Sequence, residues 1–355
     1  MSISKILLRD QISFNGKYQL LSIDQFTRDS VEQLFKIADI LQPVAQRKKI
    51  SKILDGAVLG NLFFEASTRT RVSFGSAFCR LGGSVCDTTG FTFSSMAKGE
   101  SIYDTSRVMS GYVDIMVIRH PEKGSVKEFS RVTDIPIING GDGSGEHPSQ
   151  ALLDLYTIKT EFSNLGKKLD GAHIAIVGDL KNGRTVHSLV KLLSFYKGLK
   201  ISLISPVGME IPNSVLEDSS YRNNNIFEFK KNLSEGLVNA DIVYATRVQR
   251  ERDDALENCK GYTSDFRINK EIINLYCKND VVIMHPLPRD SRHGANDLST
   301  DLDNDPRLAI FRQTDNGISI RMAIFVILMG LDDLVYNSLI HAEWQVRQNK
   351  NLNFI

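Results

Sequence analysis

Short apolar runs alternate with longer amphipathic segments along the chain, and this alternation limits the possible folds more than any other feature of the sequence. The apolar runs are flanked by turn residues, which is typical of buried strands. Because helical patterns separate them, the strands are expected to form parallel sheets. The predicted strands are 57–64, 113–119, 135–139, 172–178, 200–205, 240–246 and 280–285.

Between these runs, apolar residues recur at helical spacing. The clearest case is 184–196, where the apolar residues from Val186 to Leu193 would line one face of a helix. A second segment, 68–81, stops at a pair of glycines, a frequent signal for the end of a helix. Further helices are predicted at 149–162 and from about residue 318 to 344.

A polar connection at 164–171 separates two such series. A length of 355 residues also suits about two domains of roughly 150 residues each. We therefore predict an α/β protein with two similar-sized domains, each a mainly parallel sheet flanked by helices. The first domain would comprise 1–149, joined by a returning C-terminal helix at about 318–355, and the second 150–317.

Composition excludes several classes of protein. The 43 Lys and Arg residues balance 42 Asp and Glu residues, and a nucleic-acid surface would carry a stronger basic footprint. The late apolar run at 322–331 is far shorter than the roughly 20 residues of a membrane span. The first residues also lack the pattern of a signal peptide. We expect no nucleic-acid or membrane partner and a cytoplasmic location.

The cysteines give no sign of a metal or a disulfide framework. Cys79, Cys86, Cys259 and Cys277 form no C-x-x-C pair and do not stand near histidines at zinc-finger spacing. We expect reduced thiols, as in cytoplasmic proteins, and no structural metal.

The stretch GNLFFEASTRTRVSF, residues 60–74, places two hydroxyls and two arginines where a strand runs into a helix. Ser67, Thr68, Arg69 and Thr70 would stand at the amino end of that helix, where unpaired amides and the helix dipole favour an anion. Arginine adds a planar fork that matches phosphate or carboxylate. The alternative is an ordinary capped helix with solvated arginines. The glycines of a Walker loop are missing.

Other polar residues follow predicted strands or begin predicted helices. Arg119 ends a strand, while His147 and Gln150 stand at a helix entrance after a glycine-rich loop. Arg184 begins a helix in VGDLKNGRTVHS, which lacks the dinucleotide-binding glycines. No G-x-S-x-G or H-E-x-x-H motif occurs. We therefore expect no cofactor and neither covalent nor metal chemistry.

A set of motifs, taken together, resembles the aspartate/ornithine carbamoyltransferase family, and within it the catalytic chains that use aspartate. The motifs occur in the family's order, and several consecutive matches of this length are highly specific. They are FFEASTRTRVSF, IRHP, HPSQALLDLYTI, VGDLKNGRTVHS, TRVQRER and HPLPR, spanning about Gly60 to Ala323.

The resemblance implies a role for each matching residue. Carbamoyl phosphate would be bound by Ser67, Thr68, Arg69, Thr70, Arg119, His147 and Gln150, and by the backbone carbonyls of Pro286 and Leu287. L-Aspartate would be bound by Lys98, Arg184, Arg247 and Gln249. The residues implied in catalysis are Arg69, Thr70, Arg119, His147 and Lys98. Glu65 would bridge the two domains to Arg184 and Arg252 on closure.

The implied reaction transfers a carbamoyl group from carbamoyl phosphate to the amine of L-aspartate, in de novo pyrimidine biosynthesis. Ser94 and Lys98 match a loop that the family inserts into the neighbouring subunit's site, which implies a homotrimer with shared active sites. The sequence leaves open whether regulatory chains bind such trimers.

Some positions depart from the family pattern. Ser149 replaces a frequent threonine, Ala97 replaces a lysine found in some relatives, and extra residues lie around Ser291–Asn296. The chain also continues about 20 residues past the point where many relatives end.

Two alternatives remain. Ornithine carbamoyltransferases typically carry H-C-L-P, but here Pro286 replaces the cysteine, and a cationic acceptor suits Arg247 and Gln249 poorly. A catalytically silent subunit would be expected to have lost one of Arg69, Arg119, His147 or Arg184, and all are present.

Overall fold

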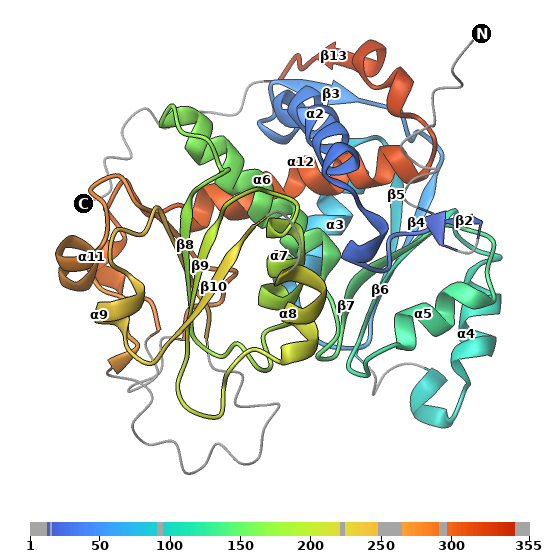
Figure 1. Cartoon of the computed structure of the whole chain (residues 1–355). Helices are drawn as coiled ribbons and strands as arrows, with labels where there is room; N and C mark the ends of the chain where they lie inside the picture. Colours follow the sequence, from blue (N-terminus) through green and yellow to red (C-terminus); the bar gives the residue numbers. More distant parts are fainter. Residues whose placement is uncertain are drawn as a thin grey trace, which may run out of the picture. The chain divides into compact units, whose positions relative to one another are not determined.

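The structure, a computed structural model, describes residues 13–14, 16–90, 95–220, 224–247, 265–290 and 297–344. The chain forms two compact units (Figure 1). Unit 1 extends to Leu152 and resumes at Asp315, and unit 2 extends from Leu153 to Thr314. The chain thus crosses between the units inside α6 (Pro148–Asn164) and again inside α12 (Ile310–Leu328).

Unit 1 contains a four-stranded parallel sheet with the order β5-β4-β6-β7. The three strands β4, β6 and β7 are mostly buried, whereas β5 is largely exposed at one edge. From β4 the chain adds β5 on one side and then β6 and β7 on the other, so the strand order reverses between β4 and β6. The strands are β4 (Val58–Phe63), β5 (Ser84–Thr89), β6 (Ile115–His120) and β7 (Ile137–Asp142).

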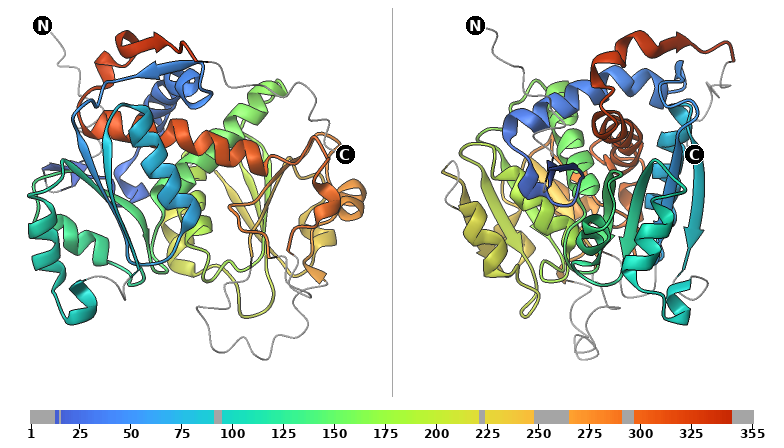
Figure 2. Two further views of the ribbon diagram at one scale, coloured as in Figure 1. Left: turned by 180° about the vertical axis from the view of Figure 1, so that it is seen from behind. Right: turned by 90° about the vertical axis from the view of Figure 1, so that its right-hand side faces the viewer.

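Helices and smaller elements complete unit 1. The helix α3 lies beside α12 (Figure 2, left), where Phe325 packs edge-on against Phe78 with ring centroids 4.9 Å apart. The helices are α2 (Arg28–Ala45), α3 (Thr68–Arg80), α4 (Ile102–Met109) and α5 (Ser125–Arg131). The short helical turns are η1 (Ile23–Gln25), η3 (Ser95–Lys98), η7 (Asp332–Leu334) and η8 (Tyr336–Ser338). The small strands are β1 (Ser13–Phe14), β2 (Lys17–Tyr18), β3 (Lys49–Ser51) and β13 (Leu339–His341).

The prediction of a single helix from about residue 318 onward is wrong at both ends. The helix α12 begins eight residues earlier, at Ile310, and ends at Leu328. Gly330 adopts a φ of 70°, and the amide of Leu331 reaches back to the carbonyl of Val326 at 2.9 Å. Such a left-handed glycine is a common helix terminator. The chain then forms β13, which pairs antiparallel with β3 in unit 1.

Unit 2 contains a five-stranded parallel sheet with the order β10-β9-β8-β11-β12. The strand order reverses between β8 and β11, as it does between β4 and β6 in unit 1. The strands are β8 (His173–Val177), β9 (Lys200–Ile204), β10 (Ile226–Lys230), β11 (Ile242–Ala245) and β12 (Val282–Met284). The helices are α7 (Arg184–Leu193), α8 (Asn213–Ser220), α9 (Leu233–Gly236) and α11 (Lys270–Tyr276), with the turn η6 (Thr300–Leu302).

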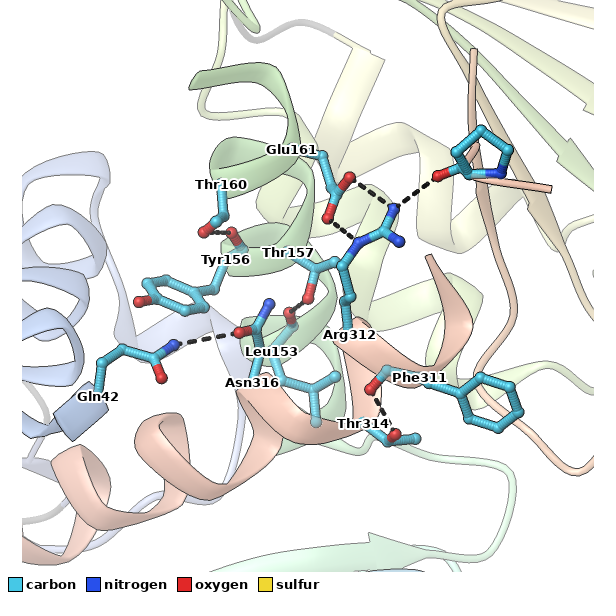
Figure 3. A network of polar contacts seen from close by, with 11 residues as sticks. Gln42, Leu153, Tyr156, Thr157, Thr160, Glu161, Phe311, Arg312, Thr314 and Asn316 are labelled. Atoms are coloured by element: carbon cyan, nitrogen blue, oxygen red, sulfur yellow. Dashed lines mark hydrogen bonds and ion pairs between the residues drawn. The ribbon is translucent and has the colours of Figure 1, made fainter. Parts of the chain in front are cut away.

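Within unit 2, α6 and α12 are joined by charged side chains (Figure 3). Arg312 donates two hydrogen bonds to the carboxylate of Glu161, at 2.6 and 2.8 Å, and a third to the carbonyl of Pro306 at 3.2 Å. The paired hydrogen bonds that Arg312 donates to Glu161 outweigh the effect of burial and raise the pKa of Arg312. This ion pair fixes α12 against α6 just before α12 leaves the unit.

The parallel sheets and the return of the C-terminal part to unit 1 confirm the predicted fold class. The sequence placed the domain boundaries at 149/150 and 317/318, and the structure divides the chain at 152/153 and 314/315. In the part of the chain that the structure describes, no helix is long and apolar enough to cross a membrane.

Candidate active site

The first group of predicted site residues lies at the carboxyl ends of β4, β6 and β7, which are neighbours in the sheet of unit 1. Phe63 of β4 is in register with Arg119 of β6, and the amide of Phe64 donates to the carbonyl of Arg119 at 2.8 Å. The chain then enters α3 directly. Parallel α/β sheets bind ligands outside the carboxyl ends of their strands, where the strand order reverses. That point in unit 1 is between β4 and β6.

The amino end of α3 carries the Ser-Thr-Arg-Thr segment. Ser67 is the N-cap residue, with extended backbone, yet its side chain makes no capping hydrogen bond within the described residues. Thr68 and Arg69 are exposed, and Thr70 is buried. The first amides of a helix have no intrahelical acceptor and stand at the positive end of the dipole. The geometry can therefore receive an anion, with Arg69 beside it on the surface.

The side chain of Arg119 is held in place by two acceptors. Its guanidinium donates to the carbonyl of Gly140 in β7 at 3.2 Å and lies 3.1 Å from the carboxylate of Glu65. Gly140 permits the close packing of β7 against β6, because an added Cβ would meet the carbonyl of Ile118 at 3.2 Å. Glu65 was predicted to bridge to Arg184 and Arg252. That pairing stays a prediction, while within unit 1 Glu65 contacts Arg119.

His147 and Gln150 begin the helix α6 after β7. The buried His147 caps the helix through its carbonyl, which accepts from the amides of Gln150 at 3.0 Å and Ala151 at 3.2 Å. Pro148 occupies the first helical position, where its missing N–H costs nothing. The hydroxyl of Ser149 lies 3.5 Å from Nδ1 of His147.

The loop before His147 is fixed by two carboxylates. Asp142 accepts from the amides of Glu146 at 2.7 Å and Gly124 at 3.0 Å. Glu146 accepts from the hydroxyl of Ser22 at 2.7 Å and the amide of Ile23 at 2.9 Å. The glycine-rich loop is thus tied by hydrogen bonds to Gly124 and to residues 22–23 of the same unit.

The second group lies at the carboxyl edge of the sheet in unit 2. Arg184 is the first residue of α7 and is buried, and Arg247 follows β11 and is half-buried. The strands β8 and β11 are paired, and the amide of Thr246 donates to the carbonyl of Val177 at 2.8 Å. The two arginines therefore leave adjacent strands at the point where the strand order reverses, the position expected for a ligand site.

Pro286 and Leu287 follow β12, the strand next to β11, and both are half-buried at the same edge. In the HPLPR motif, the resemblance assigned the backbone carbonyls of Pro286 and Leu287 to carbamoyl phosphate and gave no role to His285. The structure shows that His285 and Asp297 are buried and hydrogen-bonded to each other. The only sequence signal for His285 is its place directly after an apolar strand.

The remaining predicted residues fall into two sets. Lys98 is exposed in η3 of unit 1. Ser94, Gln249, Arg252 and the extra residues around Ser291–Asn296 lie outside the described residues. Among the described residues, no three His, Cys, Asp or Glu side chains are grouped so that they could hold a metal ion.

Comparison with known proteins finds a family model that matches each of the two units. Residues 18–160 match the family model described as aspartate/ornithine carbamoyltransferase, carbamoyl-P binding domain. Residues 170–328 match the model of the Asp/Orn binding domain of the same family. The two matches together cover most of the chain, and residues 161–169 lie between them.

Named relatives agree with the family models. The chain is 56% identical over 312 residues to the aspartate carbamoyltransferase catalytic subunit of Dichelobacter nodosus, covering 88% of this chain and 89% of the relative. It is 50% identical over 324 residues to the catalytic subunit of Saccharophagus degradans, with coverage of 91% and 96%.

Solved structures are similar as well. Aspartate transcarbamoylase from Trypanosoma cruzi in complex with carbamoyl phosphate and aspartate matches with a TM-score of 0.80 at 38% identity, covering 87% of this chain and 96% of that one. The catalytic subunit from M. jannaschii matches with a TM-score of 0.76 at 40% identity, covering 88% and 98%. The chain belongs to the aspartate/ornithine carbamoyltransferase family.

Proposed function

We propose that this chain transfers the carbamoyl group from carbamoyl phosphate to the amine of L-aspartate, giving N-carbamoyl-L-aspartate and phosphate. The observation that carries the proposal is a pair of cationic sites, each at the strand-order reversal of a parallel sheet. Arg69 and Arg119 mark the site in unit 1, and Arg184 and Arg247 mark the site in unit 2. The relatives named as aspartate carbamoyltransferases support aspartate as the acceptor.

In unit 1, the amino end of α3 receives the phosphate of carbamoyl phosphate. Ser67, Thr68, Arg69 and Thr70 donate from backbone and side chain, and Arg119 adds its guanidinium. The contacts of Arg119 with Glu65 and Gly140 orient its planar group before the substrate arrives. Because the group is already fixed, little side-chain entropy is lost on binding.

The carbamoyl group is held by hydrogen-bond donors at its carbonyl oxygen and by hydrogen-bond acceptors at its NH₂. Thr70, Arg119 and His147 contact the carbonyl oxygen, where negative charge grows as the amine attacks. Gln150 and the carbonyls of Pro286 and Leu287 take the hydrogens of the carbamoyl NH₂. Donors fixed in advance at a developing oxyanion are among the largest contributions to catalysis.

In unit 2, Arg184 and Arg247 bind the carboxylates of L-aspartate, together with Gln249 and with Lys98 from a neighbouring subunit. Two anionic substrates repel each other, so an excess of cations is needed to bring them together. Carbamoyl phosphate already contains a good leaving group, and the protein needs no nucleophile of its own. Positioning supplies most of the rate, and the departing phosphate accepts the proton of the amine.

The test is product formation by the purified protein supplied with carbamoyl phosphate and either aspartate, ornithine or no acceptor. We expect carbamoyl-aspartate with aspartate alone. Charged hydrogen bonds contribute about 1.5–3 kcal/mol each. We therefore expect Arg69→Ala to lower kcat/KM by a factor of about 10 to 100. Arg80→Ala, at the other end of α3, is the matched control and should retain activity.

Other outcomes of this assay separate the alternatives. Citrulline formed from ornithine would contradict aspartate as the acceptor. A folded protein that binds phosphate but forms neither product would identify a catalytically silent subunit.

We further propose that the chain forms a homotrimer in which Lys98 enters the neighbouring subunit's site. The exposure of Lys98 on η3 supports this assignment. The product places the enzyme in pyrimidine biosynthesis. The free thiols of Cys79, Cys86 and Cys277 support a reducing, cytoplasmic location. Because the relatives are named catalytic subunits, a separate regulatory chain is the candidate further partner.

A further inference from the structure

Leu287 adopts a backbone conformation that leucine normally avoids. Its φ is 56°, in the left-handed region that favours glycine and asparagine. A bulky residue remains there only where its surroundings enforce the conformation, and such positions concentrate at functional sites. The side chain of Leu287 packs against the apolar core of unit 2, which accounts for the leucine but leaves the backbone conformation to be explained.

The imidazole of His285 fixes the backbone of Leu287. Nδ1 of His285 accepts a hydrogen bond from the amide of Leu287 at 2.8 Å. An accepting Nδ1 carries no proton, so the neutral ring bears its proton on Nε2. Nε2 lies 2.9 Å from the carboxylate of Asp297 and donates to it. The ring is thus locked in one tautomer and one orientation.

Asp297 holds the far end of the same loop. Its second carboxylate oxygen accepts from the amides of Leu298 at 2.8 Å and Asp290 at 3.3 Å. The loop 286–289 is therefore closed at its start by His285 and at its end by Asp297. His285 is 1% exposed and Asp297 9%, so water does not compete strongly for these bonds.

A second buried series of hydrogen bonds holds the backbone of His285. Its amide donates to the side-chain oxygen of Gln313 in α12 at 3.0 Å, and Gln313 donates to Asp154 of α6 at 2.6 Å. The other oxygen of Asp154 accepts from the hydroxyl of Tyr244 at 2.7 Å. Burial and the nearby Asp154 raise the pKa of Tyr244 well above its ordinary value, so its hydroxyl stays a donor.

We propose that His285 and Asp297 are positioning residues that hold the 286–287 backbone so that its carbonyls face the carbamoyl NH₂. Because the N–H of Leu287 is committed to His285, the peptide plane that it shares with the Pro286 carbonyl is set before substrate binds, and the fixed φ constrains how the backbone continues to the Leu287 carbonyl. This inference rests on the proposed function, which assigns those carbonyls to the substrate. It adds a reason why a buried histidine precedes the two contact residues.

A matched pair of substitutions separates positioning from stability. In His285→Asn, the side-chain oxygen lies near the position of Nδ1 and still accepts from Leu287. In His285→Gln, the amide lies near the position of Nε2, so it keeps Asp297 and loses Leu287. We expect kcat/KM for carbamoyl phosphate to fall about a hundredfold in His285→Gln, the scale of a small misplacement of a reacting group, and less than about tenfold in His285→Asn.

The affinity for inorganic phosphate should be unchanged in both variants, because the phosphate residues lie in unit 1. His173→Gln is the control for loss of a buried imidazole in the same unit, because His173 begins β8, at the end of the strand opposite the candidate site, and its Nε2 lies 2.8 Å from the hydroxyl of Ser202. It should lower the melting temperature and spare kcat/KM.

The positioning role is overturned if His285→Gln and His285→Asn have equal kcat/KM, or if the losses follow the melting temperature across all three variants. Where His285→Gln does not fold, Asp297→Ala against Asp297→Asn decides, because only asparagine keeps an acceptor for Nε2–H. Equal activity of these two variants would refute the role. The wild-type protein is assayed first, so a failure of the proposed function appears as a wild type without carbamoyl-aspartate.

Discussion

Gly178 shows how a single missing methyl group sets the approach of two strands at the candidate site. It follows β8 with a φ of 131°, and an added Cβ would lie 2.2 Å from the carbonyl oxygen of Thr246. Such a distance is far inside van der Waals contact. Thr246 directly precedes Arg247, and Gly178 begins the turn that leads to Arg184. The glycine therefore permits the spacing between two arginines assigned to the acceptor.

We expect Gly178→Ala to destabilise unit 2 strongly. The left-handed conformation alone costs alanine about 1–2 kcal/mol, and overlap with a backbone atom adds about 1–3 kcal/mol. Gly208→Ala is the matched control, because Gly208 also has a positive φ, 88°, but an added Cβ would meet nothing within 4 Å. The free energy of unfolding in urea should fall more for Gly178→Ala than for Gly208→Ala. Equal losses would show that the chain relaxes around Gly178 without strain.

Arg321 connects two elements of unit 1 through one buried side chain. The guanidinium donates to the hydroxyl of Ser73 at 2.9 Å and lies 4.9 Å from the centre of the Phe74 ring. Arg321 belongs to α12, and Ser73 and Phe74 belong to α3. The helix α12 thus braces the helix whose amino end we assign to phosphate.

The turn that leads into α12 is closed by a second charged pair. Arg307 donates to the carboxylate of Asp305 from Nε at 2.9 Å and from the terminal nitrogen at 2.7 Å. These hydrogen bonds hold the pKa of the buried Asp305 below its ordinary value. The carbonyl of Arg307 in turn accepts from the amide of Ile283 in β12 at 2.9 Å. The turn before α12 is therefore tied to β12, the strand before the HPLPR loop.

The charged pair predicts a dependence of stability on pH. The pKa of an aspartate in the unfolded chain is about 3.9, and the pKa of folded Asp305 is lower. Between these two pKa values the unfolded state therefore binds more protons than the folded state. The stabilisation is present above about pH 4 and is lost as the pH falls through the folded pKa. The melting temperature of Asp305→Asn should lie below that of the wild type at pH 7, and the difference should shrink towards pH 3.

Asp134→Asn is the control for this pH series, because the Asp134 side chain is 99% exposed and its ion pair with Lys17 therefore contributes little to stability. Its melting temperature should follow that of the wild type throughout. A difference between Asp305→Asn and the wild type that stays constant from pH 7 to pH 3 would contradict a contribution from the ionised carboxylate.

The whole molecule is a protein of two units whose chain crosses twice inside helices. The proposed trimer adds a further level, since each site would need Lys98 from a neighbour. Mixed oligomers test this requirement. Arg69→Ala and Lys98→Ala, each impaired alone, should regain activity when differently tagged chains are co-expressed and mixed trimers are purified. In such trimers, some sites combine an unaltered Arg69 from one chain with an unaltered Lys98 from its neighbour.

The control combines two substitutions of residues that a single chain contributes to its site. Mixed trimers of Arg69→Ala with His147→Ala should stay impaired, because every site then lacks either Arg69 or His147. If the Arg69→Ala and Lys98→Ala mixture gains nothing over its parents, Lys98 does not act in a neighbour's site.

Sequence patterns predicted most buried strands but missed the amphipathic helix α2, which has a clear local signal, and the strand β5, which depends on its neighbour. The buried strands β4, β6, β8 and β11 were predicted because they are short and mostly apolar. The edge strand β5 has the polar sequence SVCDTT and is largely exposed, so neither hydrophobicity nor alternation reveals it. A strand of this kind exists because β4 offers a free row of backbone groups, which is a property of the sheet.

The sequence by itself determined the fold class, the family and the identities of the residues assigned to substrate, because strand and helix periods and contiguous motifs are local. Tertiary structure alone decided which carboxylate Arg119 meets, where α12 begins, and that His285 and Asp297 close the loop around Leu287. His285 and Asp297 are 12 residues apart, and Asp154 and Gln313 are 159 apart. Such pairings follow from strand order and burial, since only a folded interior brings distant polar groups together and removes the water that would otherwise satisfy them.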